Sequence, residues 1–221
     1  MMTRRIAITV VALAVMAAPA FARPTLRAGV PVDSLTPDGM QRLAVRVPVV
    51  DSQPVRLTYG VDKAEILVDV FVAASAQDAR EALEHWRHQL SREIDAVADV
   101  GDVAYGTPSL IAFAQDNVMV AVRRVSGSAD VATLAADALA AVKAAPTGSP
   151  SATPVTARVP ELIEGKAQAL ALSRDALAVR VFAQGPATVR KTRAGWRITR
   201  NRAGAVSLVV VAVDEQLRVS R

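Results

Sequence analysis

The sequence predicts an α+β protein in which an antiparallel sheet with two packing helices is followed by a small all-β sandwich. Three observations predict this fold class. Residues 23–144 read in the order strands, helix, hairpin and helix. Residues 158–221 carry short strand patterns that start about ten residues apart. Residues 145–157, rich in proline, serine and threonine, form a linker between these two predicted domains.

Five segments of the first domain have the apolar pattern of strands. In residues 65–73, Ile66, Val68 and Val70 recur at every second position, which places them on one face of a strand. The turn at Gln115, Asp116 and Asn117 is expected to join the last two strands as a hairpin. The predicted strands are residues 43–47, 55–59, 65–73, 110–114 and 118–125.

Two helices are expected in the same domain. Ser75 can accept a hydrogen bond at the N-terminus of the first, and Asp78 follows three residues later. Trp86 lies on the apolar stripe of this helix, so we interpret it as a core residue rather than a binding residue. The second helix covers residues 131–142. The stripe of the first helix comprises Ala79, Leu83, Trp86, Leu90, Ile94 and Val97.

The second domain is predicted to contain strands alone. Its short apolar runs are separated by turn signals at Gly185-Pro186, Ala194-Gly195 and Ala203-Gly204. This spacing is typical of a small sandwich. The predicted strands are residues 169–172, 177–182, 187–192, 196–200 and 207–213.

The first 22 residues have the pattern of a secretory signal peptide. Arg4 and Arg5 precede an uncharged apolar run, and Ala20-Phe21-Ala22 forms a small-x-small cleavage site. The run is shorter than a membrane span, and no later segment is long enough to cross a bilayer. We therefore expect cleavage near Ala22 and a periplasmic or secreted protein with no transmembrane span in its mature chain.

Composition excludes several classes of protein. The chain has no cysteine, which excludes a disulfide scaffold, a thiol enzyme and a cysteine-ligated metal site. A hydrophobic content of 52% excludes a wholly disordered chain. Charge divides unevenly, because residues 23–150 hold 12 basic and 16 acidic residues, whereas residues 151–221 hold 12 basic and 5 acidic ones.

Two resemblances accompany this pattern. Residues 75–143, with the Val100-Gly101-Asp102 turn and the hairpin at Asp116-Asn117, resemble secreted domains of the PsbP-like α/β-sandwich type. The last ~55 residues resemble bacterial immunoglobulin-like repeats and the small β module near the start of pilus secretins. The second likeness is carried by Glu164-Gly165-Lys166, Leu172, Val179, Val189, Trp196, Ile198, Gly204 and residues 206–210. These likenesses imply an immunoglobulin-like sandwich and an envelope-associated module, but no specific activity.

Motifs for catalysis are missing. The sequence has no nucleophile elbow, no Walker loop and no dinucleotide fingerprint. His85 and His88 are its two histidines, and we interpret them as part of a polar helix face, because a structural zinc site usually needs four ligands. We expect no catalytic residue, no metal and no cofactor. The carboxylates considered as a possible acid–base site are Asp69, Asp95, Asp99 and Asp102.

A basic run in the second domain is the main functional signal. Trp196 and Ile198 share one face of their strand, which directs Arg197 to the other. A hairpin turning at Ala194-Gly195 would gather several cations on one surface, where they can attract an anionic component or an acidic protein, including the first domain. The alternative is a solvated strand face in an arginine-rich protein, since the chain has 22 arginines and 4 lysines. The candidate residues are Arg190, Lys191, Arg193, Arg197, Arg200 and Arg202.

The predicted function is that of an exported, non-enzymatic, envelope-associated binding or interaction protein that contacts an anionic surface or partner through this basic face. Nucleic acid is not expected as the ligand, because the protein is exported and the run holds a single aromatic residue, Trp196. Two alternatives stay open. The first domain can bind a small ligand or hydrolyse a substrate with carboxylates, or the chain can be a structural assembly subunit recruited through a sheet edge.

Overall fold

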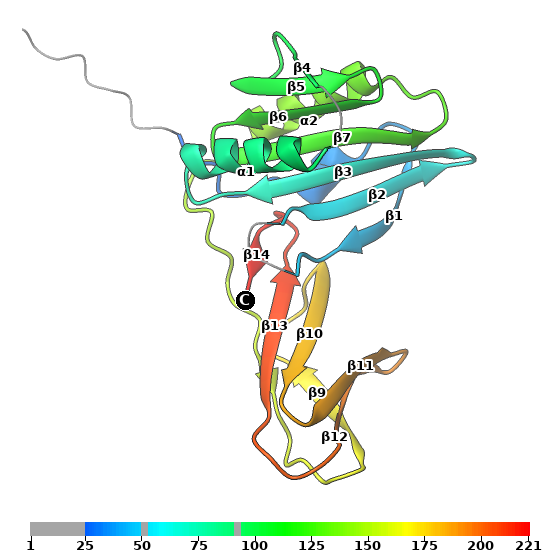
Figure 1. The fold of residues 1–221 in the computed structure, drawn as a ribbon, viewed down its shortest axis with the longest axis vertical. Coiled ribbons are helices and arrows are strands. Elements are labelled where there is room, and N and C mark those ends of the chain that lie inside the picture. The colour runs from blue at the N-terminus through cyan, green and yellow to red at the C-terminus, as the bar shows by residue number, and fades with distance from the viewer. Residues whose placement is uncertain (1–24, 50–52, 91–93) are drawn as a thin grey trace, which may run out of the picture.

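The computed structural model describes residues 25–49, 53–90 and 94–221 (Figure 1). The predicted signal peptide lies outside these residues. The described chain forms two lobes, which we call the sheet lobe (residues 25–145) and the sandwich lobe (residues 155–221). Their secondary structure confirms the predicted fold class, because an antiparallel sheet with two helices is followed by two small antiparallel sheets.

The sheet lobe is built on seven antiparallel strands in the order β1-β2-β3-β7-β6-β5-β4. Two meanders therefore lie side by side and meet where β3 pairs with β7. All five strands expected from the sequence are present. The strands are β1 (Gln41–Arg46), β2 (Val55–Val61), β3 (Ala64–Val72), β4 (Asp95–Ala96), β5 (Val103–Thr107), β6 (Leu110–Gln115) and β7 (Val118–Ser126).

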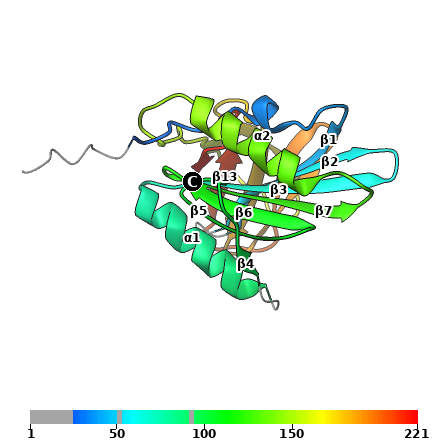
Figure 2. The same cartoon turned by 90° about the horizontal axis from the view of Figure 1, so that it is seen from above.

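Helices α1 (Ala76–Gln89) and α2 (Val131–Ala144) pack on opposite faces of this sheet (Figure 2). The expected cap is present, because the Ser75 hydroxyl accepts a hydrogen bond from the Asp78 amide at 3.1 Å. Asp130 caps α2 in the same way. A short 3₁₀ helix, η1 (Val32–Leu35), packs against α2.

Alternation along β7 explains why both faces are apolar. Val118, Val120 and Val122 belong to the larger core on the α2 side, whereas Met119 and Ala121 pack with Leu83 of α1. Successive side chains of a strand point to opposite faces, so one continuous apolar strand serves two cores.

The first helix ends earlier than its apolar stripe suggests. Helix α1 stops at Gln89, with Leu90 as its C-cap. Asp95 and Ala96 instead form β4, which pairs with β5, and the Val97 amide donates to the Ala104 carbonyl. Neither β4 nor β5 was expected from the sequence. Pairing with β5 supplies hydrogen-bond partners for the backbone of these residues. This tertiary interaction outweighs the helical spacing of their apolar side chains.

The sandwich lobe contains two facing sheets, β11-β12-β9-β8 and β10-β13-β14. Val181, Ile198 and Val210 are buried between them. The five predicted strands are confirmed, and β8 and β14 are additional. The strands are β8 (Ala157–Arg158), β9 (Ala167–Leu172), β10 (Ala178–Gln184), β11 (Ala187–Thr192), β12 (Gly195–Arg200), β13 (Ser207–Val213) and β14 (Val219–Ser220).

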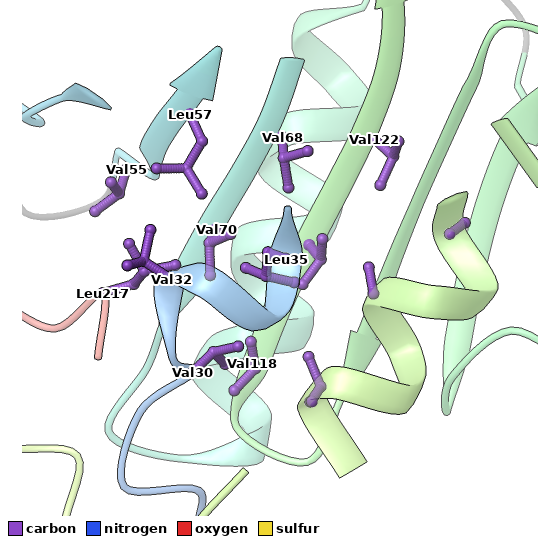
Figure 3. Packing of buried hydrophobic residues seen from close by; sticks show 14 of the residues in the cluster. Val30, Val32, Leu35, Val55, Leu57, Val68, Val70, Val118, Val122 and Leu217 are labelled. Atoms are coloured by element: carbon purple, nitrogen blue, oxygen red, sulfur yellow. The ribbon is translucent and has the colours of Figure 1, made fainter. Parts of the chain in front are cut away.

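The two lobes share apolar packing. Val211, Val213 and Leu217 of the sandwich lobe are buried in the same cluster as Val32 and Val55 of the sheet lobe. Figure 3 shows Leu217 beside Val32 and Val55. Leu217 is 1% exposed. The lobes are therefore in direct contact, although the domain boundaries at residues 144 and 158 stay a prediction.

A segment near the N-terminal end of the described chain, residues 26–32, strengthens this contact, and we call it the strap. The Ala28 amide donates to Pro146 O at 2.7 Å, and the Gly148 amide donates to Leu26 O at 2.9 Å. Further along the strap, the amides of Val30 and Val32 each donate at 2.9 Å to carbonyls of residues 215–216 in the sandwich lobe. The strap thus connects the start of the predicted linker to the C-terminal loop.

Candidate functional site

The six predicted cations lie on and beside the hairpin formed by β11 and β12. The pairing of Thr192 with Gly195 leaves Arg193 and Ala194 as a two-residue turn. The turn therefore lies one residue earlier than the expected Ala194-Gly195. Gly195 has φ +108°, a conformation that L side chains rarely adopt, so glycine is suited to this end of the strand.

Three of the cations gather on the outer side of this hairpin and at its turn. Arg190 and Arg197 are direct cross-strand partners, and both are exposed. Arg193 is exposed in the turn itself. Like charges directly opposite each other on a sheet are destabilising, so this pair favours the presence of an anion.

The other three cations have different surroundings. Lys191 lies opposite Trp196, with its ammonium 5.9 Å from the ring centroid, within reach of a cation–π interaction. Arg200 is half-buried on the same strand face as Ile198, and its Nε donates to the Arg202 carbonyl at 3.1 Å. Arg202 is exposed in the loop that follows β12. The hairpin thus divides its cations between two faces.

None of the six cations forms an ion pair with a carboxylate of the described residues. In particular, no described acidic residue of the sheet lobe pairs with one of these six cations. Figure 1 shows the hairpin well separated from the seven-stranded sheet along the long axis of the molecule. The outer face of the hairpin is therefore open to a partner outside the chain.

The other residues singled out from the sequence do not assemble into a site. His85 is exposed and hydrogen-bonded to Gln89, and His88 is exposed on the same helix. The Asp69 carboxylate is bound by Arg56, and the Asp102 carboxylate accepts the Asp116 amide at 3.1 Å. No group of three or more His, Asp or Glu side chains among the described residues has the arrangement of a metal site.

The structure also brings Asp69 together with three arginines that sequence reasoning missed. A cleft beside α1, on the sheet face that this helix covers, is lined by Arg46, Arg56, Asp69 and Arg123 together with Trp86. Arg56 donates to both Asp69 oxygens, at 2.6 and 2.8 Å, and this hydrogen bonding raises the pKa of Arg56. The sequence does contain a signal for this pair. A charged residue interrupts the apolar pattern of the second predicted strand, at Arg56, and of the third, at Asp69.

Trp86 packs against the Leu83 cluster, as expected for a residue of the apolar stripe. It is only half-buried, however, and it also forms a wall of this cleft.

Comparison of the chain with protein-family models, curated proteins and solved structures found no match. The resemblances to PsbP-like and immunoglobulin-like modules therefore stay predictions. Within the residues that the structure describes, no helix is long and apolar enough to cross a membrane.

Proposed function

We propose that this chain is an exported, non-enzymatic binding or interaction protein of the cell envelope, whose basic hairpin contacts an anionic surface or partner. One observation carries the proposal: Arg190 and Arg197 lie opposite each other, exposed and without a described carboxylate partner. The signal-peptide pattern of residues 1–22 supports the periplasmic or extracellular location.

The geometry supports electrostatic contact rather than insertion into a cleft. Cross-strand neighbours lie about 5 Å apart at their Cβ atoms, so two guanidinium groups can meet one phosphate-rich or carboxylate-rich surface. Arg193 extends the same basic region to the turn. Such contacts weaken as salt screens them.

The test is binding of residues 23–221 to isolated envelope fractions and to phosphatidylglycerol–phosphatidylcholine vesicles across a salt series. The variant carries Arg190→Gln, Arg193→Gln and Arg197→Gln. We expect affinity to fall with salt and to drop at least tenfold in this variant, because each lost cation removes about 1 kcal/mol near an anionic membrane.

A matched control separates the hairpin from the general charge of the lobe. Arg158→Gln, Lys166→Gln and Arg180→Gln remove the same number of positive charges from exposed positions of the sandwich lobe. We expect this control to lose less than threefold in affinity. Equal losses in the two triple variants, or salt-independent binding, contradict a role for the hairpin.

A further inference from the structure

Two adjoining cavities flank Trp86 on the sheet face that α1 covers. The larger has a volume of about 260 Å³ and the smaller about 130 Å³. Gln53, Pro54, Trp86 and Gln89 line both, so the cavities meet at the tryptophan. We call the two together the Trp86 cleft.

The larger cavity is cationic. Arg46, Arg56 and Arg123 line it, and Asp69 is the one carboxylate among its described lining residues. Asp69 is 5% exposed and already accepts two hydrogen bonds from Arg56. Arg46 and Arg123 form no ion pair with a described residue. The cavity therefore keeps two guanidinium charges that are not compensated by the described chain.

The position of Arg123 indicates that this excess positive charge favours an anionic ligand. It lies on β7 directly after the buried Val122 and is itself only half-buried. A partly desolvated cation without a counter-charge is unfavourable, so the site gains stability from an anion that reaches it. A guanidinium group binds carboxylate or phosphate oxygens in a bidentate manner.

The smaller cavity combines apolar and polar lining. Phe71, Ala82 and Met119 line it beside Trp86, and Gln53, His85 and Gln89 supply its polar groups. A closed apolar cavity of ~150 Å³ is large enough to hold a benzene molecule. This cavity is comparable in size, so a phenyl ring or a short alkyl chain fits the space beside Trp86.

We propose that the Trp86 cleft binds a small amphiphilic carboxylate. The carboxylate lies between Arg46 and Arg123, and the apolar part of the ligand packs on Trp86 and Met119 in the smaller cavity. An apolar pocket with a few convergent polar groups is the usual form of a small-molecule site. This site lies in the sheet lobe and does not depend on the basic hairpin of the sandwich lobe.

The test uses Trp86 as its own reporter. The chain has two tryptophans, so the variant Trp196→Phe leaves Trp86 as the single indole. Its fluorescence is titrated with 3-phenylpropionate, with propionate as the probe without a ring and 3-phenylpropan-1-ol as the probe without a charge. We expect saturable binding of 3-phenylpropionate, with each of the other two probes at least tenfold weaker.

Arg123→Gln and Arg46→Gln in the same background should each weaken 3-phenylpropionate binding at least tenfold. Arg124→Gln is the matched control, because this neighbouring arginine points to the opposite sheet face and donates to the Ala129 carbonyl. We expect it to bind as the parent does. Thermal unfolding of each variant shows whether it remains folded.

Three outcomes overturn the proposal. They are no saturable response of Trp86, equal binding of the uncharged alcohol, and unchanged binding in folded Arg123→Gln. Two cross-measurements distinguish failure of this proposal from failure of the proposed function of the hairpin. That variant should bind anionic vesicles like the parent, whereas the triple hairpin variant should bind 3-phenylpropionate like the parent.

Discussion

Asn117 and Arg27 hold each other by two hydrogen bonds although they are 90 positions apart in the sequence. The Arg27 amide donates to Asn117 Oδ1 at 2.5 Å, and Asn117 Nδ2 donates back to the Arg27 carbonyl at 3.1 Å. The same Nδ2 donates to the Ala73 carbonyl at 2.8 Å. The Arg27 side chain adds Nε to Asp116 at 2.7 Å and Nη1 to the Lys143 carbonyl at 2.7 Å. One buried asparagine thus attaches the strap to the β6–β7 turn.

We expect Asn117→Ala to lower the free energy of unfolding by about 2–4 kcal/mol, because it leaves the buried Ala73 carbonyl and the partly buried amide and carbonyl of Arg27 without these partners. Asn201→Ala is the control, since this exposed asparagine makes a single side-chain hydrogen bond to Thr188. It should cost less than about 1 kcal/mol. Urea denaturation of both variants measures the difference, and equal costs would show that the strap contact adds little.

The shared core predicts that the two lobes unfold together. Trp86 lies in the sheet lobe and Trp196 in the sandwich lobe, so Trp196→Phe and Trp86→Phe proteins each report one lobe. We expect both reporters to show the same urea midpoint. Leu217→Ala should move both midpoints down together, with a cost of about 2–4 kcal/mol from the cavity it creates. A shift seen by one reporter alone would mean that the lobes are independent.

The ion pair of the buried Asp69 with Arg56 predicts that removing the Arg56 guanidinium lowers the free energy of unfolding. Arg56→Met leaves a buried carboxylate without its partner, and we expect a loss of about 2–3 kcal/mol in the free energy of unfolding. The double variant Arg56→Met, Asp69→Asn should recover part of that loss, since no buried charge remains uncompensated.

Arg42→Met is the control for this pair. Arg42 contacts Asp33 at 3.4 Å, and the Asp33 side chain is 89% exposed. Its loss should cost less than about 0.5 kcal/mol. If Arg56→Met costs no more than this control, the buried pair does not stabilise the sheet lobe.

Asp130 at the N-terminus of α2 predicts a dependence on pH. Hydrogen bonds from the Thr133 hydroxyl at 2.6 Å and the Ala132 amide at 3.1 Å lower the pKa of this carboxyl below its ordinary value of 3.8. A lowered pKa stabilises the folded state above the unfolded value, and this contribution is lost as pH falls through the folded value.

Asp130→Asn keeps a good N-cap but removes the charge. The parent should exceed this variant in stability near pH 6, and the difference should shrink as urea unfolding is repeated down to about pH 3. A difference that stays constant over this range would contradict the role of the Asp130 charge.

The order of elements could be predicted from the sequence because the local signals agree with the final fold. Alternating valines over residues 65–73 and the Ser75 cap are local, and the structure contains both features. The strand β4 is two residues long and depends on its pairing with β5, which is a contact across a turn. A local sequence pattern does not reveal this pairing. The apolar stripe predicted for α1 therefore continues to Val97, whereas the helix ends at Gln89.

The same distinction applies to the candidate site. The basic run is contiguous, so its clustering on one hairpin follows from the sequence, and alternation places Arg190 and Arg197 on one face. The Trp86 cleft is assembled from different elements, with Arg46 from β1, Arg123 from β7 and Trp86 from α1. Their proximity requires the sheet order, in which β3 meets β7, and the sequence pattern did not specify that pairing.

The strap has a consequence for the rate of folding. It joins residues near position 27 to the turn at position 117, to the start of the linker near position 147 and to the loop near position 216. Contacts between such distant positions close long loops, and the entropy of loop closure has to be overcome before the contacts form. We therefore expect the strap to dock late, onto a sheet already assembled from its hairpins. Variants of Arg27 should then accelerate unfolding while leaving the folding rate nearly unchanged.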